Sequence, residues 1–159
     1  MNDLRSGPEN AADIVEIGDL SGSIGFLLRL AQLQVFEQFF EALSKYDLKP
    51  GEFSVLWVVS LNPGLRQGAI ARRLRIKPAH MTKVIQRLET AGFLSRTIPE
   101  DDRRSVQLSL TEVGIDFVSR HKPDFFSYFQ RDPERLSEAE LTTLITLLQK
   151  FVGIAKVGS

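Results

Sequence analysis

The sequence predicts a mainly α-helical fold with one small β-hairpin. Apolar residues recur with a 3.6-residue period over much of the 159-residue chain. Breaker clusters such as Asn62, Pro63 and Gly64 divide this pattern into separate helices. Between residues 93 and 110 the period changes to an alternation typical of strands. The composition, 43% hydrophobic and 25% charged, is that of an ordinary globular domain.

The first predicted helix is long and runs over Ser23 to Tyr46. Its apolar stripe consists of Ile24, Leu27, Leu28, Ala31, Val35, Phe36, Phe39, Phe40 and Leu43. Because this stripe is broader than one helix of a small domain buries, we expect a second surface to cover it, such as another subunit. We therefore assign residues 23–48 to a dimerisation helix and residues 1–22 to a flexible acidic tail.

Three shorter helices follow. Pro50 suits the first position of a helix that ends near Leu61. The next two are predicted over Gln67–Leu74 and from Pro78 to about Thr90, with a short connection between them. Two helices joined in this way form a helix-turn-helix. They are expected to share a core of Ile70, Leu74, Met81, Val84, Ile85 and Leu88.

A hairpin and two helices complete the pattern. Phe93 and Leu94 form one predicted strand and residues 106–110 the other, with a charged tip between them, so residues 49–111 form a winged helix-turn-helix domain. Thr111 and Glu112 begin a fifth helix, which Pro123 is expected to interrupt or kink. Ser137 and Glu140 form a capping box for the last helix.

Charge is unevenly distributed along the chain. The net charge is zero, yet residues 66–87 contain seven lysines and arginines and no acid. A concentrated positive surface of this kind is typical of proteins that bind nucleic acid.

Several function classes are disfavoured. The chain has no cysteine, which excludes disulfides, thiolate zinc sites and cysteine redox sensing. Two separated histidines and the lack of a glycine-rich phosphate loop argue against an enzyme, a metal site or a cofactor. No signal peptide or apolar run of roughly 18 to 20 residues is present, so a cytoplasmic protein is expected.

Two motifs resemble the MarR family. The stretch from Met81, Thr82 and Lys83 runs to Arg87-Leu88-Glu89-x-x-Gly92-Phe93-Leu94, and the hairpin carries Asp102-Arg103-Arg104 before Leu108-Ser109-Leu110-Thr111-Glu112-x-Gly114. The likeness extends from about Ser23 to Ala155. It implies a homodimer with long interlocking N- and C-terminal helices, two winged heads and a pseudo-palindromic operator. By this resemblance, residues 112–159 are assigned to C-terminal dimerisation helices.

The helix over residues 78–90 would then enter the major groove. Its outward positions His80, Thr82 and Lys83 are candidates for base edges, and Lys77, Gln86 and Arg87 for phosphates. Arg66 and Lys77 precede helix starts, where a cation opposes the helix dipole unless an anion such as a phosphate lies nearby. The alternative is that all of these are solvated surface residues.

The wing supplies further candidates by resemblance. Arg104 is expected to enter the minor groove beside Arg103, with Asp102 bracing the tip. The alternative is a charged turn with surface ion pairs of little energy.

The resemblance also implies a repressor released by a small aromatic or lipophilic molecule, or by an acyl-CoA thioester. Candidate ligand residues are Phe26, Arg29, Phe53, Trp57, Phe117 and His121, with Arg29 meeting a carboxylate or phosphate. The aromatic residues have an alternative role as ordinary core. A competing function is a winged-helix module that binds another protein and no DNA.

Overall fold

The computed structural model describes residues 15–43, 46–100, 105–127 and 136–154. The chain divides into two compact units, Met1–Phe36 and Glu37–Ser159. The first unit contains a short 3-10 helix, η2 (Gly18–Gly22), within the range expected to be a tail, and most of α1 (Ile24–Leu43). The second unit contains the end of α1 and all the later elements. The long first helix is thus confirmed.

The predicted helix-turn-helix consists of α3 (Gln67–Arg73) and α4 (Pro78–Thr90). Helix α2 (Pro50–Leu61) precedes the motif and packs against α3. Ile70, Met81, Val84, Ile85 and Leu88 are all buried, as expected from the helical period. The predicted core position Leu74 is only half-buried, because it follows the last turn of α3.

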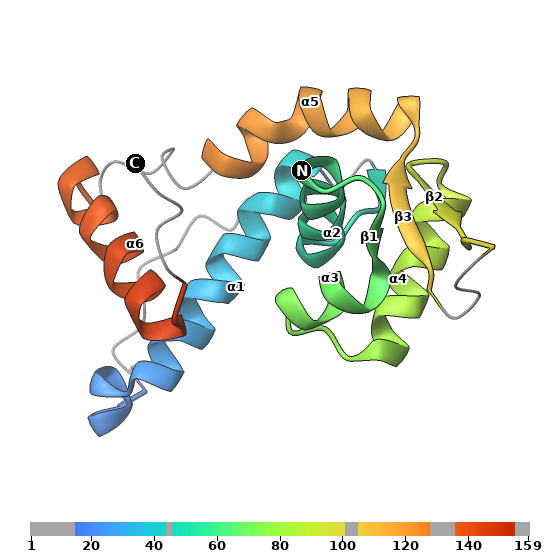
Figure 1. The fold of residues 1–159 in the computed structure, drawn as a ribbon. Helices are drawn as coiled ribbons and strands as arrows, with labels where there is room; N and C mark the ends of the chain where they lie inside the picture. The colour runs from blue at the N-terminus through green and yellow to red at the C-terminus, as the bar shows by residue number, and fades with distance from the viewer. Residues whose placement is uncertain (1–14, 44–45, 101–104, 128–135, 155–159) are drawn as a thin grey trace. The chain divides into compact units, whose positions relative to one another are not determined.

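A small antiparallel sheet packs against these helices (Figure 1). The wing consists of β2 (Leu94–Thr97) and β3 (Gln107–Leu110), and Leu94 pairs with Leu110. A third strand, β1 (Leu65–Arg66), pairs with β3 on its other side and was not predicted. Two residues are too few for an alternating pattern to be read from the sequence.

The residues after the wing form hydrogen bonds that fix the base of the wing beside the end of α4. The Thr111 backbone N–H donates to the Phe93 carbonyl at 3.1 Å, and the Thr111 hydroxyl accepts from the Gly114 N–H at 3.0 Å. Gly114 lies so close that a Cβ there would overlap the Phe93 carbonyl. Gly92 has a φ of 79°, in the left-handed region that favours glycine. The L-x-L-T-x-x-G motif therefore has a structural explanation.

Helix α5 (Glu112–Ser127) continues through Pro123, so the expected interruption there is wrong, while the alternative of a kink stays a prediction. Proline removes one backbone hydrogen bond from a helix. The turn beyond it is anchored by aromatic packing, since Phe125 stacks on Phe53 with ring centroids 4.3 Å apart and Phe126 meets Trp57 edge-on at 5.1 Å.

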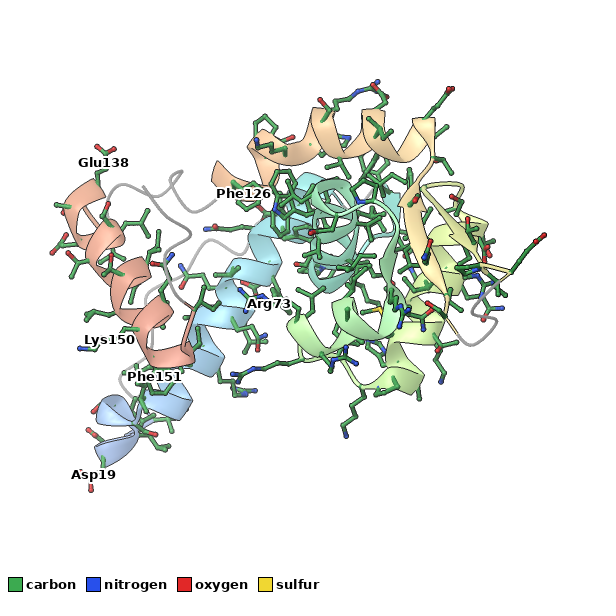
Figure 2. The ribbon with its side chains drawn as sticks, in the orientation of Figure 1. Asp19, Arg73, Phe126, Glu138, Lys150 and Phe151 are labelled. Atoms are coloured by element: carbon green, nitrogen blue, oxygen red, sulfur yellow. The ribbon has the colours of Figure 1, made fainter. Side chains whose placement is uncertain are left out.

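Helix α6 (Glu138–Val152) begins with the predicted capping box. The Ser137 N–H donates to the Glu140 carboxylate at 2.8 Å, and these hydrogen bonds from Ser137 hold the pKa of Glu140 below its ordinary value. Gly153 closes the helix with a left-handed φ of 73°. Figure 2 shows Glu138 at the start of α6 and Lys150 and Phe151 at its end. Within the described residues, no helix has the length and apolar character needed to cross a membrane.

Candidate functional site

The outward face of α4 carries the predicted DNA-binding side chains. Lys77, the N-cap residue, and His80, Lys83 and Gln86 are all exposed, while the opposite face is buried. By helical spacing, Lys83 and Gln86 lie near the middle of the exposed face. Within the described part of the chain, neither Lys77 nor Lys83 forms an ion pair with an acid. The structure thus places these predicted residues together on one solvent-facing surface.

The starts of α3 and α4 lack side-chain caps. Arg66 and Lys77 occupy the two N-cap positions, and neither side chain accepts a hydrogen bond there. Neither helix has an acidic residue in its first turn. The Gln67 N–H at the start of α3 donates to the Val106 carbonyl at 2.8 Å, and Pro78 at the start of α4 has no N–H. No side chain caps the remaining N–H groups of the first turns, and basic residues occupy both N-cap positions.

Thr82 has partners within its own chain. Its hydroxyl donates to the Pro78 carbonyl at 3.1 Å, and the Gln67 side-chain amide donates to it at 3.3 Å. Gln67 was not among the predicted site residues, although it begins the first helix of the motif. This contact joins α3 to α4 near the start of the recognition helix, α4.

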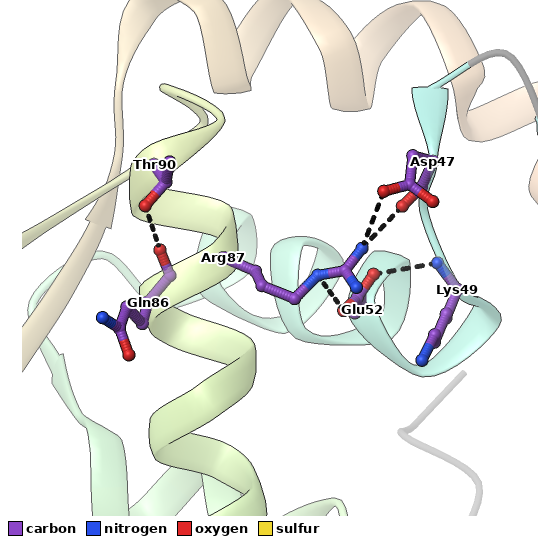
Figure 3. Close-up of polar contacts among 6 residues, drawn as sticks. All are labelled: Asp47, Lys49, Glu52, Gln86, Arg87 and Thr90. Atoms are coloured by element: carbon purple, nitrogen blue, oxygen red, sulfur yellow. Dashed lines mark hydrogen bonds and ion pairs between the residues drawn. The ribbon is translucent and has the colours of Figure 1, made fainter.

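Arg87 also has partners within the chain (Figure 3). Its Nε lies 3.2 Å from a Glu52 carboxylate oxygen, and its Nη2 donates to the Asp47 carbonyl at 2.8 Å. The Asp47 carboxylate lies 3.4 Å from the same nitrogen. Glu52 is buried and also accepts from the Lys49 N–H at 2.9 Å. The Arg87 guanidinium, which the sequence assigned to a phosphate, is therefore already paired with groups of its own chain.

The predicted wing-tip residues Asp102, Arg103 and Arg104 lie outside the described residues. The base of the wing is described, and there Arg96 on β2 forms an ion pair with Glu89 at the end of α4. This pair joins the wing to the recognition helix.

Four of the six predicted ligand residues lie in an aromatic cluster between α2 and α5. Phe53, Phe117 and His121 are buried, and Tyr46 contacts both Phe117 and His121 with centroid distances of 4.9 and 4.7 Å. The Nδ1 atom of His121 has no hydrogen-bond partner in the described structure, and the Asp124 carboxylate is 3.7 Å away. Tyr46 was not among the predicted ligand residues, because the sequence placed it at the end of the first helix and outside its apolar stripe, whereas α1 ends at Leu43.

Trp57 lies at the half-buried edge of this cluster. Its ring meets that of Phe126 and has the Lys122 ammonium 5.1 Å from its centroid. The cluster therefore offers an aromatic surface with a cation beside it. Phe26 and Arg29 belong to the other unit, where Phe26 is half-buried and Arg29 exposed.

Comparisons with known proteins agree on one family. Residues 48–106 match the model of the MarR family. The chain is 33% identical over 154 residues to a putative transcriptional regulatory protein for the hcr operon of Thauera aromatica, covering 95% of this chain and 92% of that protein.

Solved structures of a transcriptional repressor also resemble this chain. The transcriptional repressor CouR bound to a 23-mer DNA duplex is similar with a TM-score of 0.80 and 33% identity, covering 87% of this chain and 99% of CouR. CouR bound to p-coumaroyl-CoA is similar with a TM-score of 0.78 and 30% identity, over 87% of this chain and 98% of CouR. The chain belongs to the MarR family of DNA-binding transcriptional regulators and is not an enzyme.

Proposed function

We propose that the protein is a homodimeric repressor that binds a pseudo-palindromic operator through α4 and the wing, and that an aromatic acyl thioester or a related small aromatic molecule releases it. The observation that carries this proposal is the exposed basic surface of residues 66–87, which contain no acid, on a well-packed helix-turn-helix.

The electrostatics of that face favour a polyanion. Basic side chains at both helix starts oppose the helix dipoles, at a typical cost of about 0.3 to 1 kcal/mol each. A phosphate at the same position would interact favourably with both the cation and the helix start. Arg66, Lys77 and Lys83 are therefore assigned to the operator, with His80, Thr82 and Gln86 beside them. Arg104 and Arg103 are assigned to the minor groove, with Asp102 bracing the tip.

Homodimerisation is supported by the apolar surfaces that the single chain leaves exposed. Ile24, Leu27 and Leu30 on α1 are each more than 40% exposed. Leu144, Ile145 and Phe151 on α6 are exposed to a similar or greater degree. Contiguous apolar surface of this kind marks an interface with another molecule. A second copy brings a second recognition helix, as a symmetric operator requires.

The aromatic cluster supports an aromatic effector. Trp57 and Phe126 offer ring surface at its edge, and Lys122 supplies a positive charge for a carboxylate or phosphate. CouR, which shares 30% identity with this chain, binds p-coumaroyl-CoA. Trp57 would provide this surface, with the buried side chains of Phe53, Phe117 and His121 behind it. Phe26 and Arg29, which belong to the other unit, are proposed separately as ligand residues.

DNA binding by α4 is tested with a labelled duplex from upstream of the gene that encodes the protein. We expect K77Q/K83Q to weaken binding at least tenfold, since each variant subunit loses two cations from the α4 face. K150Q, an exposed lysine of α6, is the matched control and is expected to bind as the wild type does. Equal affinity for all three proteins would contradict the assignment.

The effector is tested through Trp57, the single tryptophan of the chain. Titration with p-coumaroyl-CoA is expected to change its fluorescence, and free coenzyme A should give a much smaller change because it lacks the aromatic acyl group. The thioester should bind more weakly when operator DNA is present, because the two ligands favour different states and the coupling is reciprocal. Equal thioester affinity with and without operator would remove the claim of release.

A further inference from the structure

We propose that Arg87 is a positioning residue for DNA binding, which fixes α4 against the Tyr46–Lys49 segment and the start of α2 and makes no contact with phosphate. This inference rests on the proposed function, because it concerns how the recognition helix is held. It replaces the assignment of Arg87 to phosphate that the sequence suggested.

The contacts of Arg87 converge on one small region (Figure 3). The guanidinium meets the buried carboxylate of Glu52 and both the carbonyl and the carboxylate of Asp47. Glu52 has a side chain only 5% exposed, so its charge needs a partner inside the chain. Arginine suits this role because its planar guanidinium presents several donors in a fixed geometry.

The position of Arg87 along α4 is also far from the turns that reach base edges. It lies nine residues beyond Pro78, or about 13 Å along the axis at 1.5 Å per residue. The residues that reach base edges in such motifs lie in the first turns of the helix. By helical spacing, Arg87 lies on the flank of α4 and not at the middle of its exposed face, where Lys83 and Gln86 lie.

Packing alone does not fully join α4 to the Tyr46–Lys49 segment and the start of α2. An open hollow of about 590 Å³ is lined by Tyr46, Asp47 and Glu52 on one side and by Lys83, Gln86 and Arg87 of α4 on the other. Buried apolar side chains hold the inner face of α4, whereas on this flank the contacts of Arg87 span the hollow. Among the described residues, Arg87 forms the hydrogen bond and the ion pairs found across this hollow.

The same segment also contacts α5. Asp47 holds its carbonyl toward Arg87 with a left-handed φ of 50°. The neighbouring Tyr46 ring lies against Phe117 and His121. Arg87 therefore ties the recognition helix to a segment that is itself packed on the aromatic cluster.

The test compares R87Q, E52Q and K83Q by their affinity for one 30-base-pair duplex, selected by the wild-type protein from a random-sequence library, over a range of salt concentrations. In E52Q the glutamine keeps an acceptor for the Lys49 N–H, so the start of α2 remains capped. Each protein is measured well below its unfolding temperature, so that lost stability does not appear as lost affinity.

If Arg87 positions α4, R87Q and E52Q each weaken binding by about tenfold, and the double variant is no weaker than either single one. The slope of log affinity against log salt stays at the wild-type value in R87Q and E52Q. K83Q, which loses a proposed DNA contact, lowers the magnitude of that slope.

If Arg87 instead contacts phosphate, R87Q lowers the slope by about 0.9 per phosphate, or about 1.8 for a dimer. E52Q then frees the guanidinium and leaves binding equal or tighter. Either result overturns the inference, as does a lowered melting temperature with unchanged affinity. If the wild-type protein selects no duplex at all, the proposed function fails instead.

Discussion

Single residues set the geometry of the wing base, and Gly114 shows this most directly. Its Cα lies against the Phe93 backbone, and the Thr111 hydroxyl accepts from its N–H. A side chain at this position would push the first turn of α5 away from the strand that precedes it.

We predict that Gly114→Ala destabilises the protein by about 1 to 3 kcal/mol, the usual range for forced overpacking. Urea unfolding measures the change. Gly51→Ala is the control, because Gly51 lies in α2 with open space around its Cα. It is expected to be neutral or slightly stabilising, since alanine has the higher helix propensity. Equal loss of stability in both variants would show that the contact with Phe93 is unimportant.

The sequence predicts exposure at the residue scale better than it predicts partners. The helical period correctly placed Lys83 and Gln86 on the outward face of α4. It also placed Arg87 outside the core, but its contact with Glu52 joins residues far apart in the chain. A contact of that kind depends on tertiary packing, which no local pattern encodes.

Helix ends show how local rules succeed at the scale of elements. The S-x-x-E pattern at Ser137 and the prolines at positions 50 and 78 predicted three helix starts correctly. Of the interruption or kink expected at Pro123, the interruption was wrong, and Phe125 and Phe126 hold the last turn of α5 by long-range contacts.

The capping box gives α6 a pH-dependent start. The pKa of Glu140 is lowered by its hydrogen bonds with Ser137, so its stabilising effect is present above the ordinary pKa of a glutamate. The effect is lost as pH falls through the lowered pKa of the folded state.

We predict that Glu140→Ala lowers the melting temperature at pH 7 and that this difference shrinks toward zero as the solution is acidified. Thermal unfolding followed by circular dichroism at a series of pH values gives the measurement. The control is Glu138→Ala, two residues earlier in the first turn of the same helix. It should change the melting temperature little, because no hydrogen bond to the Glu138 carboxylate is found among the described residues. A difference for E140A that stays constant down to low pH would refute the role of the charge.

At the scale of the whole molecule, the exposed apolar residues are the strongest sign that the chain packs against a partner subunit. The broad stripe of the first helix predicted a partner surface, and the exposure of Leu27, Leu144 and Ile145 agrees with that expectation. How two copies meet cannot be read from the periodicity of one chain, because the stripe specifies a face and not its partner.

We predict that Leu144→Glu/Ile145→Glu converts the protein to a monomer or a much weaker dimer, since burying two carboxylates in an apolar interface is costly. Sedimentation velocity measures the mass. Leu61→Glu is the matched control, because Leu61 is also exposed but lies at the end of α2, outside the proposed interface. Monomeric wild-type protein, or loss of the dimer in L61E alone, would contradict the proposed interface.

The central claim is that a concentrated basic surface, present once in each of two subunits, binds the phosphates of a duplex. The most direct test is the affinity of the wild-type protein for its selected operator measured across a range of salt concentrations. If the dimer neutralises about six to ten phosphates, the log-log slope is predicted to be roughly −5 to −9. An affinity that does not change with salt would contradict the account.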